Sequence, residues 1–255
     1  MSGLVVGTVA GGPIIDARPL SRWRPVLVAS ALAQILFEVM IILVNGEIAR
    51  PAIVWSTLLT IGLLVLGRRR RAGAALLGFV SLVHFATSAA FLAEGLVHPE
   101  SFWDFWLGWS IVLTAGLGVL AAAAVWRQED DGSKRARAVS LGITASIVAL
   151  GVVGGAATIA YDSEAAQDGD IALSARNLQF EPANLVADSG EVAVFVDNDD
   201  SFRHTFSIDA LDVDLEVPGG KATRVEFIAE PGAYDFYCAV SGHEDMKGVL
   251  VVNRS

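Results

Sequence analysis

Hydrophobic residues are concentrated before residue 161, where they form five long stretches separated by short polar segments. Each stretch is close to the roughly 20 apolar residues that an α-helix needs to cross the hydrocarbon core of a membrane. The pattern therefore predicts five transmembrane helices, over residues 25–44, 51–67, 72–97, 105–126 and 138–160.

The pattern changes after residue 160, where short runs of β-branched residues or of alternating apolar and polar residues appear. The run "LDVDLEVP" from residue 211 has a period of two, which predicts a strand with Asp212, Asp214 and Glu216 facing outward. Turn-forming clusters such as "DNDDS" and "VPGG" separate the runs. We expect about seven short strands in an all-β Greek-key sandwich over residues 170–255, joined to the helical membrane bundle by a polar linker at 161–169.

Composition and charge support a membrane location. The chain is 53% hydrophobic with a mean hydropathy of +0.53, which excludes an ordinary soluble domain. Eleven basic residues lie in the N-terminal segment and the loops on one side of the predicted spans, and Arg50 alone lies in the loops on the other side. Since loops rich in Lys and Arg stay in the cytoplasm, residues 1–24 are predicted to be cytoplasmic and the C-terminal domain extracytoplasmic. The protein is thus expected to be a multi-pass protein of the cell membrane.

The C-terminal domain carries few residues that bind soft metals, and they are clustered. Cys238, His243 and Met246 fall within nine residues of "DFYCAVSGHEDMKGVLVV", and His204 lies upstream. A lone cysteine in a strand-rich domain is usually a small buried hydrophobe. However, one Cys, two His and one Met, with none to spare after residue 160, match a mononuclear copper site. We therefore predict one copper ion, cycling between Cu(I) and Cu(II), held by His204, Cys238, His243 and Met246.

Two segments carry a family resemblance: "FEPANLVADSGEVAVFVDNDDSFRHTFSI" and "PGAYDFYCAVSGHEDMKGVLVV". They resemble cupredoxins, the blue (type 1) copper family that includes plastocyanin, azurin and halocyanin. The resemblance implies that His204, Cys238 and His243 are equatorial copper ligands and that Met246 is axial. Many members have three or four residues between the second histidine and the methionine, whereas this chain has two. Glu244 or Asp245 is therefore an alternative axial ligand.

The resemblance implies a membrane-anchored carrier of single electrons on the extracytoplasmic face, not an enzyme. A copper capture or delivery protein and an accessory subunit of a membrane redox complex are the alternatives. From residue 161 onward the chain has 19 acidic and 6 basic residues. Such a charge favours fast encounter with a basic redox partner, such as a c-type cytochrome or a membrane oxidoreductase, and no nucleic acid is expected to bind.

The helical half resembles no family that we recognise, but it contains ionisable residues within the predicted spans. These are Glu38, His84 and, nearer the outer end, Glu94. His84 and His98 belong to the same span or its end, so they cannot hold one heme from opposite sides. A single-histidine heme, a quinone contact or a proton relay stays open. Gln34 and Glu38, at helical spacing, are better explained as hydrogen-bonding contacts between helices.

The predicted topology can be tested by cysteine labelling in a Cys238→Ser background. A membrane-impermeant reagent added outside should label cysteines introduced at Glu100 and Ser255 but not one at Ser133, because the basic loops are retained inside. Labelling of Ser133 alone would show that the orientation is inverted.

Overall fold

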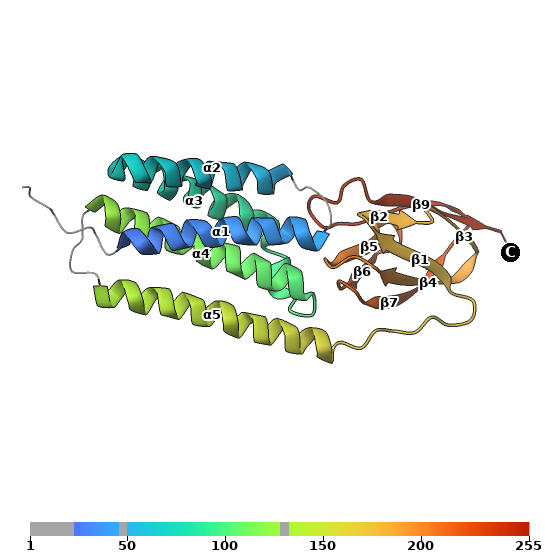
Figure 1. The fold of residues 1–255 in the computed structure, drawn as a ribbon. Coiled ribbons are helices and arrows are strands. Elements are labelled where there is room, and N and C mark those ends of the chain that lie inside the picture. The colour runs from blue at the N-terminus through green and yellow to red at the C-terminus, as the bar shows by residue number, and fades with distance from the viewer. Residues whose placement is uncertain (1–22, 46–49, 128–132, 255) are drawn as a thin grey trace, which may run out of the picture.

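The computed structural model describes residues 23–45, 50–127 and 133–254, as five long helices followed by a β-domain (Figure 1). The predicted N-terminal segment lies outside the described residues, except for its last two positions. The long helices are α1 (Trp23–Asn45), α2 (Arg50–Arg68), α3 (Arg70–Leu92), α4 (Phe102–Arg127) and α5 (Ser133–Ala160), with a short 3-10 turn, η1 (Gly95–Val97), between α3 and α4.

All five helices are long and apolar enough to cross a membrane. They are candidate spans by length and composition, as the pattern of the sequence predicted. Helix α4 is the most buried, since it packs against α1, α3 and α5. Leucine, valine and isoleucine side chains on the outward faces of α2 and α5 are exposed, which suits helices surrounded by lipid.

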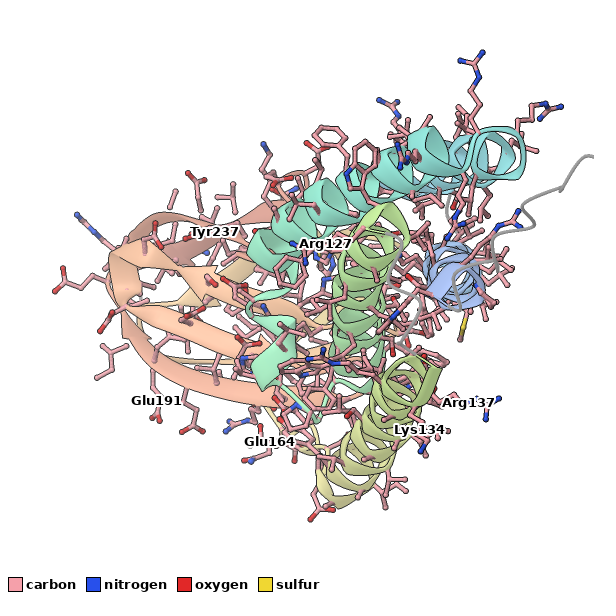
Figure 2. All side chains as sticks on the ribbon, turned by 90° about the vertical axis from the view of Figure 1, so that its left-hand side faces the viewer. Arg127, Lys134, Arg137, Glu164, Glu191 and Tyr237 are labelled. Atoms are coloured by element: carbon pink, nitrogen blue, oxygen red, sulfur yellow. The ribbon has the colours of Figure 1, made fainter. Side chains whose placement is uncertain are left out.

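Basic residues gather at the end of the bundle that points away from the β-domain. Helix α2 ends at Arg68 and α3 begins at Arg70, and both lie at this end. Figure 2 views the molecule from there and labels Arg127, Lys134 and Arg137 on α4 and α5. The two ends of the bundle therefore differ in charge, which is the asymmetry on which the predicted orientation rests.

The β-domain is a sandwich of two sheets. One sheet has the strand order β2-β1-β4-β7 and the other has the order β3-β9-β8-β5-β6. The pairs β1–β4 and β3–β9 are parallel, and the other neighbours are antiparallel. The strands are β1 (Ile171–Arg176), β2 (Gln179–Glu181), β3 (Asn184–Asp188), β4 (Gly190–Asn198), β5 (His204–Ile208), β6 (Val213–Val217), β7 (Ala222–Ala229), β8 (Gly232–Tyr237) and β9 (Lys247–Asn253).

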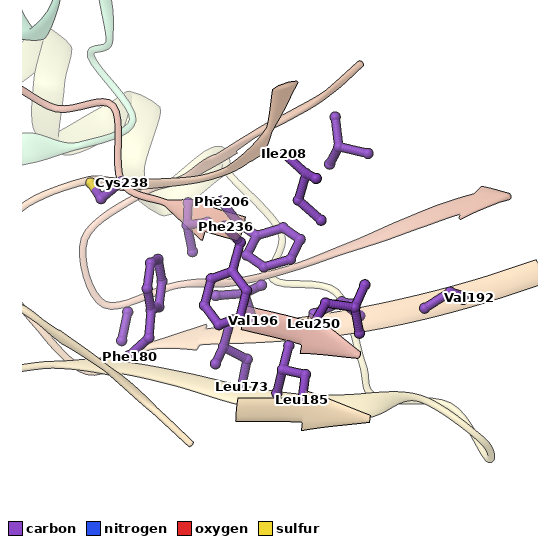
Figure 3. Packing of buried hydrophobic residues seen from close by; sticks show 14 of the residues in the cluster. Leu173, Phe180, Leu185, Val192, Val196, Phe206, Ile208, Phe236, Cys238 and Leu250 are labelled. Carbon is purple, nitrogen blue, oxygen red and sulfur yellow. The ribbon is translucent and has the colours of Figure 1, made fainter. Parts of the chain in front are cut away.

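The described part of the β-domain thus has nine strands rather than about seven. Strand β2 has three residues, too few for a period of two to be visible in the sequence. Alternating residues of both sheets form one apolar core, with Phe180, Phe206 and Phe236 in mutual ring contact (Figure 3). Cys238 lies at one edge of this core, so the predicted ligand is attached to the most rigid part of the domain.

The segment between α5 and β1 is held against the sandwich. The backbone N–H of Glu164 donates to the carbonyl of Ala222, and the Lys221 ammonium donates to the carbonyl of Tyr161. Arg224 of β7 also binds the Asp170 carboxylate at 2.9 Å. The predicted linker therefore follows β7 closely, which limits how far the β-domain can move from the helices.

Gly248 in β9 has no room for a side chain. A Cβ there would lie 2.2 Å from the Phe236 ring and 2.3 Å from the Ala183 carbonyl oxygen. Gly248→Ala should therefore lower the free energy of unfolding by about 1–3 kcal/mol, measured from the denaturant dependence of the β-sheet circular dichroism. Gly232→Ala in neighbouring β8 is the control, because its Cβ would meet only ordinary contacts at 3.5 Å. Equal stability of both variants would contradict this packing.

Candidate metal centre

Three of the predicted ligands come together at the end of the sandwich nearest the helices. His204 is the first residue of β5, and Cys238 directly follows β8, its neighbour in the sheet. His243 lies in the turn between β8 and β9, where Gly242 adopts a positive φ of 92° that favours glycine. Two adjacent strands and one tight turn thus deliver the three side chains to one place.

The ligand atoms of these residues converge closely. The Nδ1 atoms of His204 and His243 are 3.1 Å apart, and the Cys238 sulfur lies 3.8 Å and 3.5 Å from them. Within the described residues, these three form a group whose ligand atoms all lie within 4.8 Å of one another. A thiolate with two imidazole nitrogens suits copper, since trigonal His, His, Cys sites are typical of blue copper centres. The donor set therefore fits the predicted metal.

Backbone groups complete the surroundings of the sulfur. The N–H of Thr205 donates to the Cys238 sulfur over 3.4 Å, and the Cys238 N–H donates to the carbonyl of Met246 at 3.0 Å. Met246 is buried in the same core cluster as Cys238. A backbone donor at sulfur stabilises the thiolate and is one of the means by which a protein tunes a thiolate-bound metal.

The thiol is poised to lose its proton. Burial alone would raise its pKa, but contacts with His204 and His243 and the backbone N–H of Thr205 lower the pKa of Cys238 from 9.0 to about 6. His204 shows the reverse: burial opposes its charge, yet hydrogen bonds with Asp200 and Cys238 raise its pKa. Because a metal binds the thiolate rather than the thiol, the lowered pKa of Cys238 favours metal binding at neutral pH, whereas a bound metal would have to displace the proton that the raised pKa favours on His204.

The Asp200 carboxylate holds the His204 ring on the side away from the centre. Asp200 Oδ2 lies 2.9 Å from His204 Nε2, so the ring presents Nδ1 to the centre. The same carboxylate accepts the backbone N–H groups of Asn177 and Leu178, and these hydrogen bonds outweigh burial and keep its pKa low. Asn198 donates to the carbonyls of Phe202 and Val217, which closes the loop that carries Asp200. His204 is therefore held in one orientation before any metal binds.

Comparison with known proteins agrees with this geometry. The family model of the cupredoxin-like domain matches residues 146–252. The β-domain is a cupredoxin-like domain. The match begins inside α5, upstream of the first strand at Ile171, and the predicted domain boundary at residue 170 stays a prediction.

Similar solved structures include copper proteins. A reduced tryptophan-to-tyrosine mutant of amicyanin is 22% identical, with 34% of this chain and 86% of that chain covered and a TM-score of 0.29. An oxidised methionine-to-leucine mutant of amicyanin is 21% identical over the same shares, with a TM-score of 0.30. The copper-containing nitrite reductase of Thermus scotoductus SA-01 is 21% identical, with 38% and 25% covered and a TM-score of 0.29. No curated protein matches the chain.

The alternative axial ligands lie apart from the centre. Glu244 is exposed, and its carboxylate accepts the backbone N–H of Gly242 at 2.9 Å, which lowers its pKa. Asp245 is exposed as well. Neither carboxylate belongs to the group of converging ligand atoms. The cupredoxin-like domain therefore gives no support to a carboxylate ligand, and Met246 stays the predicted axial donor.

The loop before His204 is inserted into the end of the helical bundle. Phe202 packs against an apolar cluster built by α1 and α4, whose members include Phe37, Leu107, Ile111, Trp103 and Trp106. The backbone N–H of Arg203 donates to the Asp104 carboxylate of α4 at 2.8 Å. The Arg203 guanidinium joins Glu94, at 2.6 Å, to Glu216 of β6, at 2.7 Å. The ligand loop is thus shared between the two halves of the protein.

This interface adds to one expectation. Glu216 was predicted to face outward with Asp212 and Asp214, and on this outer face it is half-buried and paired with Arg203. The alternation of apolar and polar residues shows on which face of a strand a side chain lies, but it does not show what packs against that face. Here the helical half packs near the face that carries Glu216. Asp104, Arg203 and Asp200 were not predicted as site residues. Arg203 and Asp200 lie within four residues of His204, which is a usable signal, whereas Asp104 comes from a distant helix.

The polar residues inside the bundle form a compact cluster. His84 Nδ1 lies 3.2 Å from the Gln34 side-chain oxygen, and Nε2 lies 2.8 Å from a Glu38 oxygen. The His84 ring stacks on Trp55 with the ring centres 4.8 Å apart. These contacts join α1, α2 and α3. The cluster supports the interpretation of Gln34 and Glu38 as contacts between helices.

The poised thiol gives a pH prediction. In the metal-free protein, Cys238 should be a thiolate at pH 7 and take up a proton as the pH falls through about 6, since its pKa lies below the ordinary 9.0. The ultraviolet absorbance of the thiolate, taken as the difference between the native protein and Cys238→Ser, measures this titration. A midpoint near the ordinary value would show that the histidines do not stabilise the charge.

Proposed function

We propose that this chain is a membrane-anchored, mononuclear blue copper protein that carries single electrons. The convergence of one buried thiolate and two imidazole Nδ1 atoms is the observation that carries the proposal. Met246 is the proposed axial ligand, because it is buried in the same core as Cys238 and its backbone carbonyl accepts a hydrogen bond from the Cys238 N–H. Copper in this site would supply a one-electron couple between Cu(I) and Cu(II).

The residues of the chain would keep the site unchanged between the two oxidation states. His204 begins β5 and Cys238 directly follows the neighbouring strand β8, next to a close-packed core, and Asp200 and Asn198 hold the loop between β4 and β5. A rigid donor set lowers the structural cost of adding or removing one electron, because little has to move. Four ligands leave no position for a substrate, which favours an electron carrier over an enzyme.

The five apolar helices support anchoring in a cell membrane, and their charge asymmetry supports an extracytoplasmic β-domain. A cavity of about 780 Å³ lies beside Cys238 on the surface of the domain, with Asp235 and Glu244 among its lining residues. A basic partner such as a c-type cytochrome is proposed for this acidic domain, because attraction between opposite charges raises the rate of encounter.

Copper delivery is the competing function. Delivery requires a metal that exchanges easily, but His204 and Cys238 are buried. Apart from these two residues, His243 and Met246, the domain has no His, Cys or Met. Slow exchange of bound copper with a chelator would support the carrier, and rapid release to the chelator would favour delivery.

The full-length protein in detergent should bind one copper and turn intensely blue when oxidised, through charge transfer from the thiolate. Cys238→Ser should abolish the colour while the circular dichroism is retained. A folded native protein that stays colourless with stoichiometric Cu(II) would refute the proposed function.

Met246→Leu should keep the colour but raise the reduction potential, because loss of the axial thioether disfavours Cu(II). Met40→Leu is the matched control, since Met40 belongs to the helical half and lies in the cluster around Phe37. A redox titration followed at the blue band distinguishes the two. An unchanged potential in Met246→Leu would show that this methionine is not a ligand.

A further inference from the structure

A cavity of about 410 Å³ lies between the helical half and the cupredoxin-like domain, apart from the metal centre itself. Both halves contribute to its wall. Its lining residues are Phe102 and Trp103 of α4, Gly155, Thr158 and Ile159 of α5, Asp199, Asp200 and Ser201 of the loop after β4, and Gly219 and Gly220 of the turn before β7. Its volume lies within the range of sites for small organic ligands.

The position of the cavity favours a ligand that comes from the membrane. Phe102 begins one candidate span, and Ile159 is the penultimate residue of another. The cavity therefore lies at the level where the hydrocarbon core ends and the β-domain begins. Helix α5 is the least buried of the five spans, so this side of the cavity adjoins lipid rather than protein. An amphipathic molecule dissolved in the membrane could enter here.

The two sides of the cavity differ in chemistry. On the helical side, the rings of Phe102 and Trp103 offer flat apolar surfaces. On the opposite side lies Asp200, whose carboxylate accepts three hydrogen bonds and leaves one of its roughly four acceptor positions free. One fifth of the Asp200 side chain is exposed. A ring that carries a hydroxyl group matches this combination of aromatic wall and acceptor.

Asp200 also connects the cavity to the metal centre. Its Oδ2 contacts Nε2 of His204, and Nδ1 of the same ring faces Cys238 and His243. A hydroxyl group bound at Asp200 would therefore be joined to the centre through one carboxylate and one imidazole. Within the described residues, the cavity beside Cys238 has no lining residue from the helical half, so it lacks this connection to the membrane.

We propose that the cavity between α4, α5 and the loop after β4 binds the ring of a lipid-soluble hydroquinone. The ring lies against Phe102 and Trp103, and one ring hydroxyl donates to the Asp200 carboxylate. This assignment deepens the proposed function, and its role rests on that function: the hydroquinone is then the electron donor. Oxidation to the quinone delivers two electrons and releases two protons to water on the side of the β-domain. The centre takes one electron at a time, and the redox partner of the proposed function removes the first electron before the second is transferred.

Gly155 offers a way to fill the cavity without disturbing its walls. A Cβ at Gly155 would meet no atom within 4 Å, and the same is true of Gly142 on the same helix. Gly155 lines the cavity, whereas Gly142 is exposed away from it. Gly155→Leu should therefore block the ring, and Gly142→Leu is the matched control for the effect of a leucine on α5.

Binding is measured first, without copper. The Cys238→Ser protein in detergent is titrated under nitrogen with decyl-benzoquinol, and quenching of tryptophan fluorescence is followed, since Trp103 lies in the cavity wall. We expect saturable quenching, unchanged by Gly142→Leu and weakened at least about tenfold by Gly155→Leu, because the added side chain occupies the ring position. Gly155→Ala, which adds only a methyl group, should fall between.

The outcomes separate this inference from the proposed function. Quenching that does not saturate, or that is equal in Gly155→Leu and Gly142→Leu, would overturn the hydroquinone site, because the probe would then be dissolved in the micelle or bound elsewhere. In the copper-loaded native background, Gly155→Leu should slow reduction by decyl-benzoquinol and leave reduction by ascorbate unchanged. Equal slowing of both reductants would overturn the inference. A failure to bind copper would refute the proposed function, but it would not affect the measured binding of the ring to the cavity.

Discussion

The contact between Arg203 and the helical half determines how the rest of the molecule is arranged. Its guanidinium is almost fully buried, and a buried charge is tolerated only when opposite charges pair with it. Glu216 supplies one partner from the sandwich and Glu94 supplies the other from the helices. Because His204 is the next residue, the pairing that joins the two halves also fixes where the first ligand lies.

The neighbours of Arg203 extend this connection in both directions. Phe202 is packed among aromatic and aliphatic side chains at the end of the bundle, so the loop is anchored by apolar contact as well as by charge. On the other side, Asp200 holds the His204 ring from the loop that also lines the cavity at the ends of α4 and α5. One short loop thus contacts the helical half, the cavity and the candidate metal centre. The helices therefore help to orient this candidate centre.

The sequence alone predicted the features that depend on the local pattern of residue types along the chain. The five candidate spans follow from apolar length. The convergence of His204, Cys238 and His243 follows from the scarcity of Cys and His after residue 160, while Met246 as a ligand stays a prediction. The number of strands was underestimated, and a strand such as β2, with three residues, carries no detectable period. Asp104 and the covered position of Glu216 were missed for a different reason, since both depend on how two separately folded halves meet. No local periodicity encodes such contacts.

The most direct test of this account is a distance measurement between the two halves. The Val97 side chain, near the end of the bundle, and the Ile228 side chain, on β7, are both exposed. Each is replaced by cysteine in a Cys238→Ser background, and a spin label is attached to both cysteines. Pulsed electron resonance on the protein in lipid should give one narrow distance distribution that broadens when Phe202 and Arg203 are both replaced by serine. A broad distribution in the unaltered loop, or a narrow one that the double replacement leaves unchanged, would contradict the claim that this loop fixes the metal centre against the membrane half.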